Sequence, residues 1–334
     1  MPDESLLIIH QGALGDFILT FPAFTRLQKY YKPIDVLCQN QQGQLAKTLG
    51  LADNWYPSEA AYFSSLFSTQ VDPKIKAILA QYENIILFTW SEELEQSIKR
   101  VTANVRCRIS PQPPARRRIH VTEFVLENIA NGGLIAKEDA TLDATRFAIS
   151  EDHPRDFKKI LLHPGAGSIR KRWPVSGFIQ VEIALEKAGL KPEFILGPAD
   201  KNLTDALQGP GRPVHLPDNL PELVVLLRSA GGYIGNDSGA SHLAAYIGLS
   251  TAVIFGPADP QRWAPVGRAV QIVRPSLQCR PCFETEPANC DDPQCLAGID
   301  PQKVMEAFYS VYFNPDPPAA ENQKSSITKR RKHT

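Results

Sequence analysis

The sequence predicts an α/β protein built from two doubly wound parallel β-sheets that face each other across a cleft. Short apolar segments of strand length alternate with amphipathic segments of helix length, and the alternation restarts in the second half of the chain. Short buried strands separated by helices are typical of parallel βαβ units. Ligands bind such sheets at the carboxyl ends of the strands, so a cleft between two of them is the expected site.

The first half opens with a predicted strand, turn and helix. "SLLIIH" is apolar and of strand length, and "DFILTFPAFTRLQKYY" has the periodicity of one amphipathic helix. The elements expected after these are a strand at 33–39, a helix at 43–50, a strand at 84–90, a basic loop at 106–120 and a helix from 121 to Gly132. The run Arg116-Arg117-Arg118 in the basic loop is interpreted as a solvated face.

The pattern restarts after a connector that contains proline and charged residues, Ser150 to Pro154. We therefore expect one domain over residues 1–153 and a second over 154–313. The elements expected in the second are strands at 158–163, 192–197, 232–235 and 251–256, and helices at 174–189, 220–231 and 239–248. The basic tail 314–334 is rich in Pro, Gln, Ser and Lys and is predicted to be disordered.

Composition limits the classes of function. The 334 residues suit two domains, and the 43% apolar and 22% charged residues are those of a soluble globular protein. The 36 basic and 36 acidic residues cancel, so no nucleic-acid partner is expected. No secretion signal is recognisable at the N-terminus, which favours a cytoplasmic location. The uncharged span between Asp237 and Asp259 contains glycines and is interpreted as a buried helix and strand, not a membrane span.

Three strand-to-helix turns contain the candidate functional residues: Gly12–Asp16, His163–Pro174 and Gly235–Ala245. Small residues there expose backbone N–H groups, which suits anions. A dinucleotide fingerprint needs G-x-G-x-x-G and an acid at the end of the second strand, and a P-loop needs G-x-x-x-x-G-K-[ST]. The sequence has neither pattern, so both kinds of nucleotide site are set aside.

Charged residues in the second and third turns have two interpretations each. Lys171 and Arg172 precede a predicted helix, where they can neutralise a diphosphate or simply be exposed bases. Asp237 can bind a ligand or cap the following helix. His242 can face a ligand or be a satisfied core histidine.

The blocks "GALGDFILTFPAF", "HPGAGSIRKRWP" and "GNDSGASHLAAYIGLSTAVIFGPADPQRWAP" resemble the three signature blocks of the ADP-heptose:lipopolysaccharide heptosyltransferases, glycosyltransferase family nine. The resemblance covers roughly residues 5 to 313, and the third block is its most specific part. It implies the GT-B fold, two Rossmann-like domains with the site in the cleft. It also implies transfer of a heptose from ADP-heptose to the lipopolysaccharide inner core, with inversion and without a metal or cofactor.

The resemblance also implies roles for single residues. Asp16 corresponds to the proposed catalytic base, Lys171 to the lysine on the donor phosphates, and Gly12 and Gly15 to the acceptor-side loop. The remaining positions implied for donor binding are Ala166, Gly167, Asp200, Asp237, Ser238, Gly239 and His242. Asp200 stands where many members carry a glutamate that binds the adenosine ribose, so the shorter acid is a departure.

Two rival functions stay open: a GT-B glycosyltransferase with another nucleotide sugar, and a nucleotide-binding protein without transfer activity. The expected partners are an ADP-heptose donor and a lipopolysaccharide core or lipid A acceptor, with at most peripheral contact to the inner face of the membrane. The basic loop from Arg106 to Arg118 is a candidate for contact with acceptor phosphates or anionic lipid.

Four of the six cysteines form a group of their own: Cys279, Cys282, Cys290 and Cys295. The C-x₂-C-x₇-C-x₄-C spacing has the residue types of a structural zinc site or an iron–sulfur cluster, although its second pair is wider than the usual knuckle. Reduced thiols within a loop are the alternative. Catalytic use is not expected, because no cysteine falls in the three blocks.

Overall fold

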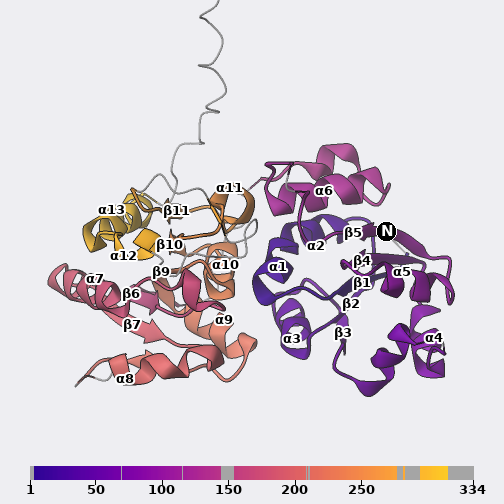
Figure 1. Ribbon diagram of the computed structural model, residues 1–334, viewed down its shortest axis with the longest axis horizontal. Coiled ribbons are helices and arrows are strands. Elements are labelled where there is room, and N and C mark those ends of the chain that lie inside the picture. Colours follow the sequence, from indigo (N-terminus) through magenta and orange to yellow (C-terminus); the bar gives the residue numbers. More distant parts are fainter. Residues whose placement is uncertain are drawn as a thin grey trace, which may run out of the picture.

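The computed structural model confirms an α/β fold with two parallel sheets (Figure 1). It describes residues 4–68, 70–114, 116–143, 154–207, 209, 211–276, 281–282 and 294–314. The first sheet has the order β3-β2-β1-β4-β5 and the second β11-β10-β9-β6-β7-β8, with every described pairing parallel. Residues 4–143, which contain the first sheet, are called the first half, and residues 154–314, which contain the second sheet, the second half.

The strands of the first sheet are β1 (Leu6–His10), β2 (Ile34–Cys38), β3 (Asn54–Pro57), β4 (Asn84–Phe88) and β5 (Val105–Ile109). Its helices are α1 (Leu14–Leu19), α2 (Phe21–Leu27), α3 (Asn40–Thr48), η1 (Ala61–Phe67), α4 (Pro73–Leu79), α5 (Glu92–Lys99), α6 (Val121–Asn131) and η2 (Lys137–Ala140). The central strands β1 and β4 are completely buried, as their continuous apolar sequence predicts.

The second sheet is formed by β6 (Asp156–His163), β7 (Lys191–Ile195), β8 (Val214–His215), β9 (Ala230–Asn236), β10 (Ser250–Ile254) and β11 (Val270–Val273). Its helices are η4 (Ile169–Lys171), α7 (Val175–Lys187), η5 (Pro198–Leu203), α8 (Thr204–Leu207), α9 (Leu220–Arg228), α10 (Gly239–Tyr246), α11 (Pro260–Trp263), α12 (Gln294–Ala297) and α13 (Pro301–Tyr312). The uncharged span is α10 followed by β10, and no helix among the described residues is long and apolar enough to cross a membrane.

Two expectations for the first half are wrong. The single helix expected at 16–31 is two helices with a break at Thr20, because Pro22 in the first turn of α2 has no N–H to continue the ladder of α1. The expected basic loop is partly a strand: Val105–Ile109 forms β5, the edge of the first sheet, beside β4. Most of the connector and all of the tail beyond Asn314 lie outside the described residues.

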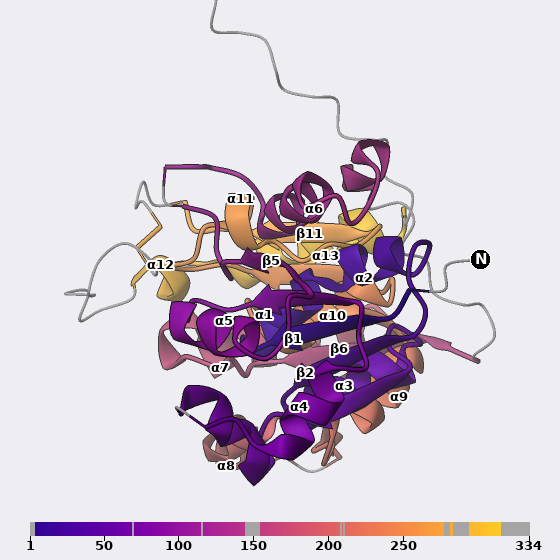
Figure 2. The ribbon, with the colours of Figure 1, turned by 90° about the vertical axis from the view of Figure 1, so that its right-hand side faces the viewer.

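The two halves share one apolar core. Helix α1 packs against α10, and α3 packs against α9 (Figure 1). The rings of Phe21 and Tyr246 meet edge to face across the halves, with centroids 5.1 Å apart. In both views α6 of the first half lies beside α11 of the second (Figure 2). There His120 Nε2 lies 2.8 Å from the carbonyl oxygen of Ala264. The carboxyl ends of β1 and of β6 and β9 therefore lead into turns that meet between the halves.

Candidate active site

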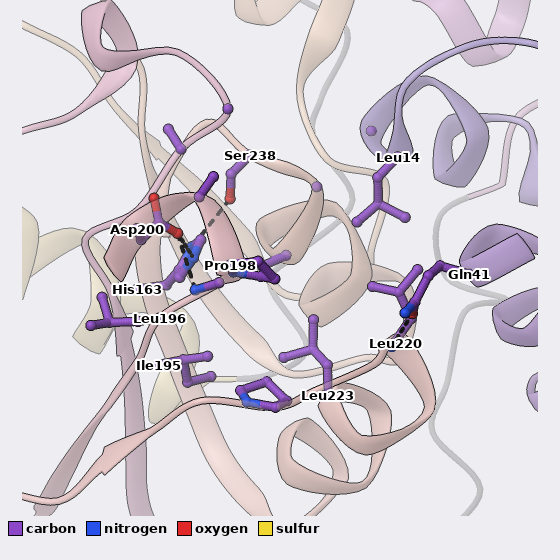
Figure 3. Close-up of a pocket in the computed structure, with 18 of the residues that line it drawn as sticks. Leu14, Gln41, His163, Ile195, Leu196, Pro198, Asp200, Leu220, Leu223 and Ser238 are labelled. Carbon is purple, nitrogen blue, oxygen red and sulfur yellow. Dashed lines mark hydrogen bonds and ion pairs between the residues drawn. The ribbon is translucent and has the colours of Figure 1, made fainter. Parts of the chain in front are cut away.

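A cleft in two adjoining compartments lies where these turns meet. The larger compartment, about 460 Å³, extends along the second half and is lined by apolar side chains that include Ile195, Leu196, Leu220 and Leu223 (Figure 3). The smaller compartment, about 370 Å³, contains the charged groups Asp16, Lys171 and Asp237, together with His242. The two compartments share the wall residues Ala13, Gly15, Gly167, Ser238 and Gly239.

Asp16 belongs to the first turn of α1, directly after the glycine turn that follows β1. Its Oδ2 accepts a hydrogen bond of 3.2 Å from the backbone N–H of Ala13. Burial raises the pKa of Asp16 above the ordinary aspartate value; the Ala13 N–H and Lys171 oppose this rise, and the negative charge of Asp237 adds to it. A carboxylate in such a position is a stronger base than an exposed aspartate.

Lys171 and Asp237 form a close ion pair on the opposite wall of the smaller compartment. Lys171 Nζ lies 2.8 Å from Asp237 Oδ2. Burial raises the pKa of Asp237, although Lys171 lowers it.

His242 lies in the first turn of α10, and its Nε2 is 4.0 Å from Asp237 Oδ1. Burial, together with the positive charge of Lys171 and the neighbouring His120, lowers the pKa of His242 to about 3, so this imidazole is neutral at physiological pH. Its Nδ1 has no hydrogen-bond partner among the described residues. A neutral imidazole of this kind can hydrogen-bond a sugar hydroxyl but does not add positive charge.

Glycines allow the two halves to approach at the cleft. A Cβ on Gly15 would lie 3.3 Å from His242 Cδ2, and a Cβ on Gly239 would lie 2.8 Å from Leu14 Cγ. A Cβ on Gly12 would lie 3.0 Å from Asp16 Cβ and 2.7 Å from His10 Cε1. These glycines therefore bring Asp16 of the first half close to the groups of the second.

Asp200 lines the larger compartment, but its carboxylate already accepts hydrogen bonds from other groups of the protein (Figure 3). Its Oδ1 accepts a hydrogen bond of 2.9 Å from Arg172, and its Oδ2 accepts one of 3.1 Å from the backbone N–H of Gly197. Burial acts to raise the pKa of Asp200, but His163, Gly197 and Arg172 outweigh it, and the pKa lies below the usual value.

Arg172 also donates hydrogen bonds to the carbonyl oxygen of Ala166 and is not among the residues that line the two compartments. Its guanidinium therefore organises the turn, and of the two bases expected near a diphosphate only Lys171 reaches the cleft. Ala166 and Gly167 line the larger compartment, and Ser238 lies on the boundary as the N-cap of α10.

Replacing Gly165 by alanine tests this arrangement. The new Cβ would lie 2.0 Å from Asp200 Oδ2, so the carboxylate must leave Arg172 and Gly197. We expect Gly165→Ala to lower the free energy of unfolding by about 1–3 kcal/mol and to weaken nucleotide binding. The control is Gly167→Ala, whose Cβ meets nothing within 4 Å. Urea denaturation of both variants measures their free energies of unfolding. Equal denaturation midpoints would show that the contact of the new Cβ with Asp200 does not destabilise the fold.

Several cleft residues were not expected from the sequence. Gln112 and Trp263 line the smaller compartment, and His163 lines the larger. Gln112 belongs to the segment after β5, which is fixed to the second half where Arg262 donates to the carbonyl oxygen of Pro113. Such long-range contacts leave no local pattern in the sequence.

The basic segment 106–118 is largely engaged within the protein. Arg106 bonds Asn84. Arg108 pairs with Glu92 and Glu95, and Arg117 pairs with Glu127. Arg116 and Arg118 are exposed, and the contact of the segment from Arg106 to Arg118 with acceptor phosphates or anionic lipid stays a prediction.

The cysteine group is only partly described. Cys279 and Cys290 lie outside the described residues, while Cys282 and Cys295 are half-buried and form no disulfide among the described residues. Among described residues, no group of three or more His, Cys, Asp or Glu side chains is placed to hold a metal ion. The zinc or iron–sulfur site stays a prediction without support from the described residues.

Comparison with known proteins confirms the resemblance to family nine. Residues 130–290 match the model of glycosyltransferase family 9 (heptosyltransferase). The lipooligosaccharide heptosyltransferase 2 of Campylobacter jejuni is 29% identical over 170 residues, 48% of this chain and 53% of that protein. The lipopolysaccharide heptosyltransferase 2 of Salmonella typhimurium is 23% identical over 186 residues, 53% and 52% of the two chains. The chain thus matches about half the length of these curated relatives.

Solved structures are similar over nearly the whole chain. A family 9 glycosyl transferase from Veillonella parvula has a TM-score of 0.74 at 17% identity, covering 93% of this chain and 97% of its own. ADP-heptose lps heptosyltransferase II from E. coli has a TM-score of 0.69 at 17% identity, covering 93% and 99%. At this identity the likeness establishes the fold, two Rossmann-like halves of the GT-B type. Asp16 lies outside the stretch that the family model matches.

Proposed function

The chain carries a glycosyltransferase family 9 domain over residues 130–290, and from this premise we propose that it transfers a heptose from ADP-heptose to the inner core of lipopolysaccharide. The observation that carries the proposal is the meeting of Asp16 from the first half with Lys171 from the second in one compartment. That compartment adjoins a larger apolar one of a size suited to a nucleoside.

The donor is proposed to lie along the second half. Its nucleoside occupies the larger compartment, and its diphosphate reaches the boundary formed by Gly167, Ser238 and Gly239. Lys171 and the N-terminus of α10 then stabilise the negative charge that grows on the leaving ADP. Because this charge is met by protein groups, the proposed reaction needs no metal ion.

The acceptor is proposed to approach from the first half, beside Gly12 and Gly15. Asp16 accepts the proton of the attacking sugar hydroxyl as the new C–O bond forms, and the bond between the heptose and ADP breaks on the opposite face. A single in-line displacement of this kind inverts the anomeric centre. The acceptor is anchored by lipid, so the proposal includes at most peripheral contact with the inner face of the membrane.

A thermal-shift measurement with ADP, UDP, GDP and ADP-heptose tests the donor assignment. We expect ADP and ADP-heptose to raise the unfolding temperature most, since a ligand at about 100 times its Kd adds about 2.7 kcal/mol to the free energy of unfolding. Greater stabilisation by UDP or GDP would indicate a transferase with another donor. No stabilisation by any nucleotide would contradict the proposed function.

A further inference from the structure

The smaller compartment contains a side chain of the first half that has no role in the proposed reaction, Gln112. It lines the compartment together with Asp16 and Lys171 and is half-buried. Its side-chain amide has no hydrogen-bond partner among the described residues. An amide carries two N–H donors and one oxygen acceptor, so all of these remain available to a ligand in the compartment.

The segment that carries Gln112 has little conformational freedom. Its neighbours Pro111 and Pro113 have fixed φ angles, and each favours an extended backbone at the residue before it. Ser110 Oγ also donates a hydrogen bond of 2.6 Å to the backbone carbonyl oxygen of Gln112. Residues 110–113, called the strap, therefore present Gln112 in a defined backbone conformation.

Arg262 of α11 fixes the strap to the second half. Its guanidinium donates a hydrogen bond of 2.9 Å to the carbonyl oxygen of Pro113, and only 7% of Arg262 is exposed. A hydrogen bond from a charged donor is stronger than one between neutral groups, and burial strengthens it further. This contact therefore determines where Gln112 lies relative to the second half.

Two other polar groups of the smaller compartment also have no partner. Trp263 Nε1 and His242 Nδ1 are buried and have no hydrogen-bond partner among the described residues. A buried polar atom without a partner costs free energy, which a ligand that supplies the partner recovers. The indole N–H only donates, whereas the amide of Gln112 both donates and accepts. Sugar hydroxyl groups match this mixture, because each of them also donates and accepts.

The position of the compartment indicates which sugar it holds. It adjoins the shared wall where the diphosphate is proposed to bind, and most of its lining residues belong to the second half, along which the donor is proposed to lie. The sugar that follows the diphosphate therefore enters this compartment.

We propose that Gln112 and Trp263 bind hydroxyl groups of the sugar that is transferred, and that Arg262 is a positioning residue that holds the strap in place for this contact. The inference rests on the proposed function, because it takes the sugar of ADP-heptose as the ligand. It adds the residues by which the protein distinguishes the complete donor from the bare nucleotide. Arg262 touches no reacting atom and acts through Gln112.

Equilibrium titrations of the full chain with ADP and with ADP-heptose, in the absence of acceptor, test the inference. We expect Gln112→Leu to weaken ADP-heptose binding by about 2- to 10-fold and to leave ADP affinity unchanged, because only the sugar reaches Gln112. Trp263→Phe retains an aromatic ring but removes the N–H, and it should also weaken ADP-heptose binding alone. The matched control is Gln44→Leu, since Gln44 is a half-buried glutamine of α3 that lines neither compartment.

Arg262→Met tests the positioning role. Without the bond to Pro113 the strap is no longer fixed, so ADP-heptose affinity should fall about as far as in Gln112→Leu. In the double variant Gln112→Leu/Arg262→Met the second substitution should add little further loss, because both act on the same contact. A purely structural role of Arg262 would instead lower the affinities for ADP and ADP-heptose together. The variants of Gln112 and Trp263 leave Arg262 in place, so they remain decisive if Arg262→Met does not fold.

Equal ADP-heptose affinity in the unaltered chain and in Gln112→Leu would overturn the inference. An equal loss of affinity for ADP and for ADP-heptose would also overturn it. So would a raised KM for the acceptor with unchanged ADP-heptose affinity, since Gln112 would then bind the acceptor. Absence of ADP-heptose binding in the unaltered chain would instead contradict the proposed function, so the two failures are distinguishable.

Discussion

Replacing Asp16 by asparagine is expected to lower the rate of heptose transfer by about 10²- to 10⁴-fold and to leave ADP affinity unchanged. The amide keeps the shape of the side chain and can still accept the hydrogen bond from Ala13, but it cannot take the acceptor proton. Steady-state transfer assays combined with ADP titration check both parts. The control is Asp72→Asn, because Asp72 also stabilises a helix start, that of α4, but lies outside the two compartments.

The pH dependence gives this prediction a second measurement. Burial raises the pKa of Asp16, so the base becomes protonated, and transfer falls, at a higher pH than for an ordinary aspartate. The sign for stability is opposite to that of a salt-bridged acid: the folded state binds this proton more tightly, so ionised Asp16 destabilises the fold at neutral pH. Asp16→Asn should therefore raise the unfolding temperature at neutral pH while it removes activity. Normal turnover by this variant would mean that another group is the base.

Replacing Lys171 by methionine has the second large expected effect, because two functions are lost together. The leaving diphosphate loses its cation, which should lower transfer by about 10²- to 10³-fold. Asp237, only 3% exposed, also loses its ion-pair partner, which should lower the free energy of unfolding by about 1–3 kcal/mol. Transfer assays and urea denaturation measure the two losses separately.

The double variant Lys171→Met/Asp237→Asn separates these losses. Removing the second charge should restore most of the unfolding free energy but none of the transfer activity. Lys99→Met is the control, since Lys99 forms an exposed pair with Glu95 on α5 and should cost little. If Lys171→Met retained both ADP affinity and transfer, the role given to Lys171 would be wrong.

The sequence predicted the features that depend on local pattern. Apolar runs such as Leu6–Ile9 predicted the central strands. Glycines and charges drew attention to the three turns, and the resemblance to family nine implied roles for Asp16, Lys171 and Asp237, which line one compartment of the cleft. The break at Thr20 was missed because the apolar periodicity continues through Pro22. Strand β5 was missed because an edge strand with alternating arginines has little apolar signal.

The remaining site residues depend on contacts between distant segments. Nothing near Gln112 in the sequence shows that Arg262 will fix its segment over the smaller compartment. Similarly, His163 contacts Asp200 and Ser238, which are far apart along the chain. The expectation for Asp200 was incomplete, because its contact with Arg172 depends on how the second turn folds.

The interface between the first half and the second half has a consequence for protein engineering. Specific contacts across it include Leu14 on Gly239, Gln41 Oε1 accepting from the backbone N–H of Leu220 at 3.0 Å, and His120 with Ala264. A chimera that exchanges the second half for that of a relative must preserve these contacts and the apolar core that the two halves share. Under the proposed function, with the donor on the second half and the acceptor on the first, such a chimera is expected to combine the donor choice of one parent with the acceptor choice of the other.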